Sequence, residues 1–182
     1  MSRSVKCSWQ QIVPIGGAIP VERSSHGVSI ISNTLYVFGG EHDARVPIDS
    51  DIYSINISKE AAASSSVAWR KIRGGETAPI PRIAHGQATI GNKLYVYGGR
   101  QGDQMEEKPM NDLHYFDIES EKWTQIVDVN GNFPSPRSFH QMVSIGSSLF
   151  VFGGCGVEGR LSDLYEFETK SSTWIKHSNV RL

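Results

Sequence analysis

Leu35-Tyr36-Val37-Phe38-Gly39-Gly40 is the stretch that decides the fold of this chain, because closely similar strings return twice further along. The second copy is Leu94-Tyr95-Val96-Tyr97-Gly98-Gly99, and the third is Leu149-Phe150-Val151-Phe152-Gly153-Gly154. The copies follow one another at offsets of 59 and 55 residues. A period of this length indicates a repeat architecture, in which each copy is one supersecondary unit.

Three further elements recur in the same order around each string. An arginine and a histidine precede it at the same offsets: Arg23 and His26, Arg82 and His85, Arg137 and His140. An aspartate follows it in each unit, and the next two residues are an apolar residue and then a tyrosine or histidine: the aspartates are Asp51, Asp112 and Asp163. A tryptophan ends each unit and another precedes the first: Trp69, Trp123, Trp174 and Trp9. Four linked elements in three copies make chance a poor explanation.

Each unit is predicted to form four short strands. In the first unit these are residues 26–31, 35–38, 51–55 and 67–72, which are rich in β-branched and aromatic side chains. Residues 60–66 have no apolar stripe, so they are predicted to form a loop, and no helix is expected. The glycine pairs are expected to adopt positive φ and to let a neighbouring aromatic ring pack against the backbone.

Composition excludes several classes of protein. The 182 residues carry a formal net charge of −1, without a dense basic run, so neither nucleic acid nor a membrane surface is an expected partner. The two cysteines, Cys7 and Cys155, lack the spacing of a zinc site, and a reducing compartment fits them best. The N-terminus has no signal-peptide pattern. We therefore expect a cytoplasmic protein, with the nucleus as the alternative location.

The order of these elements resembles the kelch repeat, and the resemblance extends from Trp9 to Trp174. In kelch proteins each repeat is one four-stranded blade of a β-propeller. The resemblance therefore implies an all-β kelch β-propeller with three four-stranded blades.

The phase of the repeats implies a strand before the first blade. Trp9 matches the outermost strand of a blade, so residues 8–22 are expected to be a closing strand and linker. The blades are then expected at residues 23–76, 77–130 and 131–182. Propellers close with about four to eight blades. Three blades are therefore expected to be half of a six-bladed ring, completed by self-association or by further blades.

Within the kelch proteins, the residue pattern of these repeats is most similar to that of the nitrile-specifier and thiocyanate-forming proteins. In that subgroup, arginines in the loops after the glycine pairs hold the sulfate of a glucosinolate aglucone. The resemblance assigns this binding role to Arg100 and, with a different loop length, to Arg160, and Glu41 is a further candidate ligand-binding residue. A guanidinium suits such an anion. The alternative is that these arginines are solvated or form salt bridges between blades.

No catalytic residue and no metal site are predicted. The specifier proteins use a ferrous site of the form Glu-x-x-x-Asp-x-x-x-His, which this sequence lacks, so Fe(II) is expected only if further blades supply it. The repeated histidines lie a blade width apart and are expected to hydrogen-bond to loop backbone. The repeated arginines Arg23, Arg82 and Arg137 are expected to be structural, around a channel mouth.

Two functions from different classes remain open. The first is an interaction module, a scaffold or adaptor whose loops on one propeller face bind a protein or peptide. The second is part of a specifier-like protein that acts with Fe(II) on a small anionic molecule.

Overall fold

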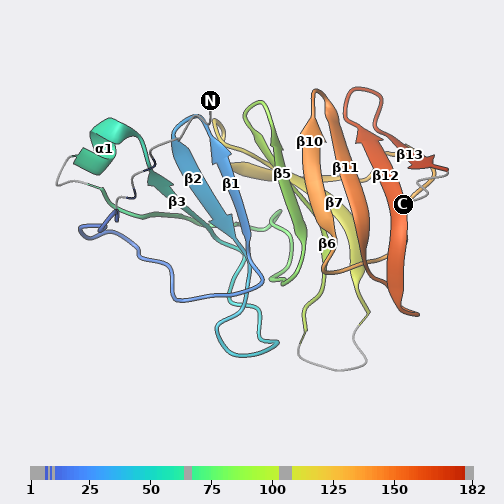
Figure 1. Ribbon diagram of the computed structural model, residues 1–182, viewed down its shortest axis with the longest axis horizontal. Coiled ribbons are helices and arrows are strands. Elements are labelled where there is room, and N and C mark those ends of the chain that lie inside the picture. Colours follow the sequence, from blue (N-terminus) through green and yellow to red (C-terminus); the bar gives the residue numbers. More distant parts are fainter. Residues whose placement is uncertain (1–6, 8, 10, 64–66, 103–107, 179–182) are drawn as a thin grey trace, which may run out of the picture.

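The computed structural model describes residues 7, 9, 11–63, 67–102 and 108–178 as three antiparallel sheets arranged side by side (Figure 1). Blade 1 consists of β1 (Gly27–Ile31), β2 (Thr34–Phe38), β3 (Ile52–Asn56) and β4 (Arg70–Ile72). Blade 2 consists of β5 (Gly86–Ile90), β6 (Lys93–Gly99), β7 (Met110–Asp117) and β8 (Lys122–Ile126). Blade 3 consists of β10 (Gln141–Ile145), β11 (Ser148–Cys155), β12 (Arg160–Glu168) and β13 (Thr173–His177), with β9 (Asn130–Gly131) parallel to β13.

The predicted all-β architecture of four-stranded blades is confirmed, and the three blades do not close a ring within the described residues. The prediction that no helix forms is wrong, because α1 (Lys59–Ala63) makes a single turn after β3. Its start is capped by Ser58, whose hydroxyl accepts a hydrogen bond from the Ala61 amide at 3.1 Å. In the described part of the chain, no helix is long and apolar enough to cross a membrane.

The N-terminal segment pairs with blade 1. Trp9 lies outside every described strand and is 99% exposed, whereas Gly17 forms a parallel bridge with Trp69. Blade 3 repeats this arrangement, since Gly131 pairs with Trp174. The linker before a blade thus runs along the outer strand of that same blade, and Asn130 belongs to the sheet of blade 3. No described strand forms around Trp9, so its role as a closing strand stays a prediction.

The core lies between the blades rather than inside any one of them. One buried cluster joins Phe38 and Ile52 of blade 1 to Leu94, Val96 and other side chains of blade 2. A second cluster joins the opposite face of blade 2 to blade 3. Each sheet is thin and covers its apolar faces only with its neighbours, so the stability of one blade depends on the next.

An aromatic triplet occupies the middle of each contact between blades. Phe38 of blade 1 packs against His85 and Trp123 of blade 2, with ring centroids 5.4 and 5.0 Å apart. Tyr97 of blade 2 packs in the same way against His140 and Trp174 of blade 3, at 5.4 and 5.3 Å. We call each such set of three rings an aromatic triplet. Ring pairs of this geometry contribute about 0.5–1.5 kcal/mol beyond the area they bury.

The glycine pair makes room for the histidine of the next blade. Gly98 has φ of +60°, and a Cβ at this position would lie 2.7 Å from the Arg137 carbonyl oxygen and 3.1 Å from His140 Cε1. The predicted positive φ of the glycines is confirmed. The ring that packs there is the repeated histidine, for which the sequence predicts a hydrogen bond to loop backbone instead.

We predict that Gly98→Ala destabilises the fold far more than Gly91→Ala, a matched change at a similar φ with no atom within 4 Å of the added Cβ. Gly91→Ala should cost only backbone strain, about 1 kcal/mol. Gly98→Ala should cost a further ~1–3 kcal/mol because it overpacks the contact between blades. Urea denaturation measures both free energies of unfolding, and equal losses would contradict this account.

Candidate functional site

The repeated arginines hold each blade together at its inner edge. Arg82 has no exposed side-chain surface, and its guanidinium donates to the Gly98 carbonyl at 2.9 Å and to both carboxylate oxygens of Asp112 at 2.7 Å. Arg137 makes the equivalent bonds to Gly153 and Asp163, and it is also fully buried. A planar guanidinium therefore fixes the first glycine carbonyl against the third strand. These two arginines are buried inside their blades, and their place around a channel mouth stays a prediction.

Blade 1 departs from this pattern. Arg23 donates to the Gly39 carbonyl at 3.0 Å, but its guanidinium lies over the Tyr53 ring, 4.7 Å from the centroid. The equivalent aspartate, Asp51, binds Lys71 Nζ at 2.7 Å instead. Arg23 is accordingly only half-buried.

Asp112 stands at the centre of a polar network that joins Arg82 and His114. Burial alone would raise the pKa of its carboxyl, but hydrogen bonds from Arg82 and His114 outweigh burial and hold that pKa well below its usual range. His114 Nε2 lies 2.9 Å from the carboxylate. The network is internal to blade 2, and the Asp112 side chain keeps 25% of its surface exposed.

The histidines of the second and third repeats are buried and neutral. Burial, together with the positive charge of Arg82, lowers the pKa of His85 to about 3, and burial beside Arg137 lowers that of His140 to about 4. Neither ring has a well-oriented hydrogen bond among the described residues, so the expected bonds to loop backbone are replaced by ring packing. His26 is exposed, because no blade precedes it in the structure.

The residue after each glycine pair occupies an equivalent place in all three blades. Glu41, Arg100 and Cys155 form antiparallel bridges with Ser24, Ile83 and Ser138, the residues that follow the repeated arginines: these six residues line the same edge of the arc. This edge is opposite the β1–β2, β5–β6 and β10–β11 turns, which lie along the top of Figure 1. Side chains at these positions vary in charge, so the scaffold presents different chemistry from blade to blade.

A cavity of about 630 Å³ opens at this edge between blades 2 and 3. Its lining residues are Arg100, Phe139, Gly154, Cys155, Arg160 and Leu161. The structure thus brings the two sequence-predicted arginines to one cavity from two different blades. Arg160 Nη1 lies 3.1 Å from Cys155 Sγ, which orients its guanidinium.

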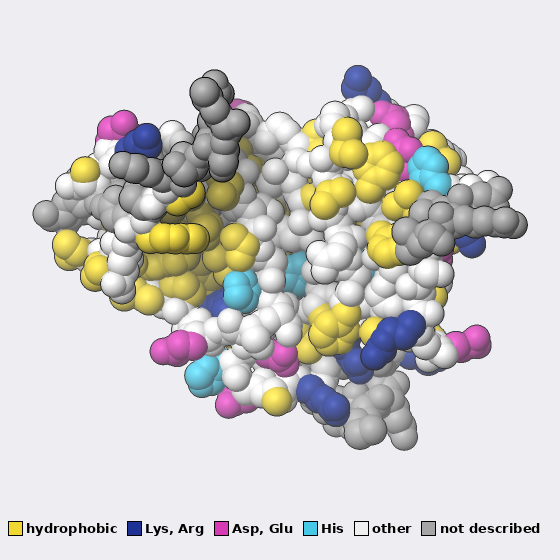
Figure 2. Space-filling model, viewed as in Figure 1, with side chains coloured by type: hydrophobic (Ala, Val, Ile, Leu, Met, Phe, Trp, Pro, Cys, Tyr) yellow, Lys and Arg dark blue, Asp and Glu magenta, His cyan; other side chains and the backbone are white. Residues whose placement is uncertain are grey.

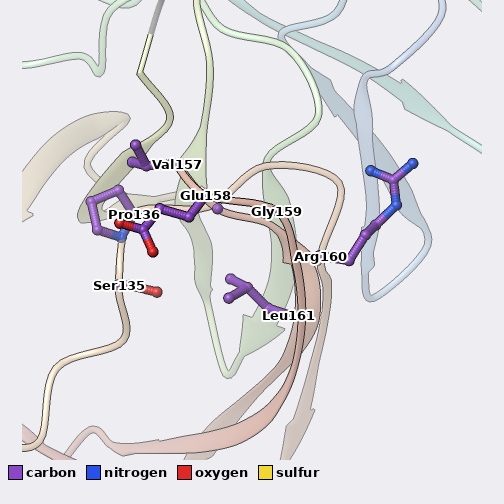
Figure 3. A pocket seen from close by; sticks show the side chains of 8 residues that line it. Ser135, Pro136, Val157, Glu158, Gly159, Arg160 and Leu161 are labelled. Carbon is purple, nitrogen blue, oxygen red and sulfur yellow. The ribbon is translucent and has the colours of Figure 1, made fainter.

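A second, smaller cavity of about 450 Å³ adjoins the first at the loop between β11 and β12. Figure 3 shows Ser135, Pro136 and Glu158 gathered on one side, with the Arg160 side chain pointing away from them. The Arg160 guanidinium is therefore separated from the carboxylate of its own loop.

Glu41 does not share the cavity. Its carboxylate accepts hydrogen bonds from the Ser25 hydroxyl at 2.8 Å and the Arg45 amide at 2.6 Å, which tie the loop after β2 to the inner edge of blade 1. The structure therefore gives Glu41 an internal role in its own loop.

Phe139 and Cys155 are cavity residues that sequence reasoning missed. Cys155 follows the third glycine pair, the position that identified Arg100, so the repeat alignment contained its signal. Phe139 lies between Arg137 and His140 and has a φ of +57°, as Ser25 and Ala84 have at +55° and +54°. Backbone bonds join these three residues in series, from Ala84 N to Ser25 O at 2.9 Å and from Phe139 N to Ala84 O at 2.8 Å. This chain of bonds holds Phe139 at the inner edge, where its side chain is 54% exposed.

Within the described residues, no group of three or more His, Cys, Asp or Glu side chains could hold a metal ion.

An arc of four-stranded blades with these repeated contacts defines a propeller of the kelch class. The chain matches the KLHDC2/KLHL20/DRC7 Kelch-repeats domain over residues 3–179. It belongs to this kelch-repeat family.

Several curated proteins are similar to the chain along nearly its whole length. An N-(sulfonatooxy)prop-2-enimidothioate sulfolyase of Thlaspi arvense is 31% identical over 93% of the chain and 46% of its own length. Kelch domain-containing protein 2 of Bos taurus is 29% identical over 94% and 45%, and Kelch domain-containing protein 1 of Mus musculus is 28% identical over 92% and 44%. The chain thus spans about half the length of these relatives.

We predict that acid destabilises the protein through His85 and His140. An unfolded histidine has a pKa of about 6.5, so between that value and the lower folded pKa the unfolded chain binds more protons. This part of the stability is complete above about pH 6.5 and falls as the pH decreases, by up to about 1.4 kcal/mol per pH unit for each histidine.

Urea denaturation between pH 7 and pH 4.5 measures this slope. His85→Gln should reduce it, whereas His26→Gln, at the exposed equivalent position, should change it much less. An unchanged slope in His85→Gln would rule out the buried neutral histidine as its source.

Proposed function

We propose that this chain is the binding face of a kelch interaction module, and that its cavity between blades 2 and 3 receives an acidic group of a partner protein or peptide. The observation that carries the proposal is that Arg100 and Arg160, from different blades, line the same cavity. Two guanidinium groups can donate several charge-assisted hydrogen bonds to one carboxylate.

Phe139 supports a peptide or protein partner. It is a large apolar side chain, 54% exposed, at the wall of a cavity that otherwise presents cationic groups. Partner surfaces that combine an acidic residue with an apolar neighbour would match both features. Exposed aromatic and arginine side chains together are typical of residues that contribute most to binding.

The scaffold fixes the backbone of these residues without a ligand. The cavity lies beside the buried Arg137–Asp163 pair and the contact between Tyr97 and His140. Little backbone ordering is therefore required on binding, which favours affinity.

A second candidate function is supported by the sulfolyase relative, whose name specifies a substrate that carries a sulfate group. The same two guanidinium groups suit a sulfate as well as a carboxylate. Because the described residues offer no metal site, we derive no reaction step for this chain. Turnover of a sulfated aglucone by the chain with added Fe(II) would favour this second function.

We predict that Arg100→Ala and Arg160→Ala each weaken binding of an acidic peptide at least about tenfold, because a hydrogen bond to a charged group contributes about 1.5–3 kcal/mol. A fluorescein-labelled peptide of Glu and Leu residues serves as the probe, and its Gln counterpart should bind weakly to all variants. Fluorescence polarisation measures the dissociation constants.

Lys170→Ala is the matched control, because this exposed cation lies in the β12–β13 turn, at the other end of blade 3 from the cavity. It should leave binding unchanged. The melting temperature should also stay constant in the two arginine variants. A lower melting temperature with unchanged peptide affinity would assign the arginines to salt bridges between blades and overturn the proposal.

A further inference from the structure

A small cavity lies beside the linker that enters a blade, under the loop between the second and third strands of that blade. In blade 3 it is lined by residues 135–136 of the linker and residues 156–161 of the β11–β12 loop, and its volume is about 450 Å³. Blade 1 has an equivalent cavity of about 350 Å³, lined by residues 21–22 and by the β2–β3 loop. We call this feature the linker notch. In both blades the linker residues that line it are the two before the repeated arginine.

The linker notch is a feature of the single blade. Both of its walls come from one blade and the linker that enters it. In blade 1, His42 Nδ1 lies 3.1 Å from the Glu22 carbonyl oxygen and so joins the two walls. The notch of blade 1 remains although blade 2 follows it, and the notch of blade 3 remains although blade 2 precedes it. Neither a preceding nor a following blade therefore fills it.

Glu158 supplies a carboxylate to the notch of blade 3. Figure 3 shows this carboxylate on the same side as Ser135 and Pro136. Glu158 is exposed, and within the described part of the chain its carboxylate makes no hydrogen bond or ion pair. Other carboxylates at this edge are bound to a cation, a hydroxyl or a backbone amide: Glu41, Asp51, Asp112 and Asp163. Glu158 is thus available to a cation from outside the chain.

The remaining walls of this notch are largely apolar. Pro136, Val157 and Leu161 line it, and Val157 is 61% exposed. A lysine side chain combines an aliphatic stem with a terminal ammonium group, so the stem can lie along apolar walls while the ammonium reaches a carboxylate. The ammonium carries three donors, and a carboxylate is an acceptor only. The notch of blade 3 therefore has the chemistry of a lysine subsite.

The linker notch of blade 3 adjoins the cavity between blades 2 and 3. Arg160 and Leu161 line both, so one loop separates the two. The Arg160 side chain points away from Glu158 (Figure 3), which leaves positive charge on one side of the loop and negative charge on the other. Figure 2 shows side chains of both charges along the lower edge, on the side that blades 2 and 3 occupy in Figure 1.

We propose that one extended peptide segment of a partner protein occupies both places, with an acidic side chain in the arginine cavity and a lysine in the linker notch of blade 3. The inference rests on the proposed function, because it takes the acidic group to be bound by Arg100 and Arg160. The charges of such a segment complement those of the protein in order along the edge. Glu158 is then a residue that determines specificity.

The geometry of an extended chain sets the spacing of the two side chains. Alternate residues of an extended segment point to the same side and lie about 6.5 Å apart. Because a single loop separates the two places, we expect the acidic residue and the lysine to be two positions apart. A small sulfated molecule would fill the arginine cavity alone and give Glu158 no role, so the notch favours a peptide.

Fluorescence polarisation with end-capped, fluorescein-labelled peptides tests the inference. One peptide carries Glu and Lys two residues apart, a second carries Gln in place of Lys, and both are made in the two sequence orders. In one order the Lys peptide should bind about three- to fivefold more tightly than its Gln counterpart, the range of an exposed ion pair. Glu158→Gln should bring the two affinities together. Glu60→Gln, at an exposed acidic residue of α1, should keep the preference.

A charge reversal separates direct recognition from an indirect effect on the loop. Glu158→Lys should bind a peptide with Glu in place of Lys more tightly than the Lys peptide, so that the preference inverts. A change in loop structure alone would alter the affinities for both peptides in the same direction. Circular dichroism checks that every variant is folded.

The outcomes distinguish this inference from the proposed function. A preference for Lys that is absent, or that persists in Glu158→Gln, would overturn the inference, and weaker binding by Arg100→Ala would still support the proposed function. A preference for Lys that depends on Glu158, with no effect of Arg100→Ala, would leave the notch as a lysine subsite and overturn the role of the arginine cavity. Failure of all peptides to bind would overturn both.

Discussion

Packing of a histidine ring over the glycine backbone of the preceding blade is the contact on which the rest of this structure depends. The sheets have four strands and little interior of their own, so their apolar side chains are buried only where blades meet. Gly39 and Gly98 leave the space, His85 and His140 fill it, and Trp123 and Trp174 complete the aromatic triplets. Because the imidazoles are uncharged there, the contact is apolar in character although it is built from a polar residue.

The same contact determines where a binding site can form. Once the glycine pair is fixed by the repeated arginine and by the next blade, the residue that follows it emerges at the inner edge in a constant orientation. That residue differs from blade to blade, as Glu41, Arg100 and Cys155 show, while the backbone pairing at the position stays the same. The repeated residues therefore specify the scaffold, but they do not specify the chemistry of the cavity between blades 2 and 3.

Sequence reasoning predicted what is local and repeated. The strands, the positive φ of the glycines and the equivalence of the arginines all follow from the spacing of the strings around Gly39, Gly98 and Gly153. It could not predict contacts that depend on how side chains and blades pack in the folded structure. Asp112 and Asp51 look equivalent in the sequence, but one binds the repeated arginine and the other binds Lys71. Phe139 joins the cavity because a chain of backbone hydrogen bonds across three blades positions it. The short helix α1 depends on one capping hydroxyl, which a search for an apolar pattern does not reveal.

The central claim is that the histidine couples energetically to the aromatic ring of the preceding blade, and a double-mutant cycle between Tyr97 and His140 tests it most directly. The free energies of unfolding of Tyr97→Leu, His140→Ala and the double variant are measured by urea denaturation. The account predicts a favourable coupling energy of about 1 kcal/mol, since the two rings are in direct contact across the blades. Additive losses, with a coupling energy of zero, would contradict it.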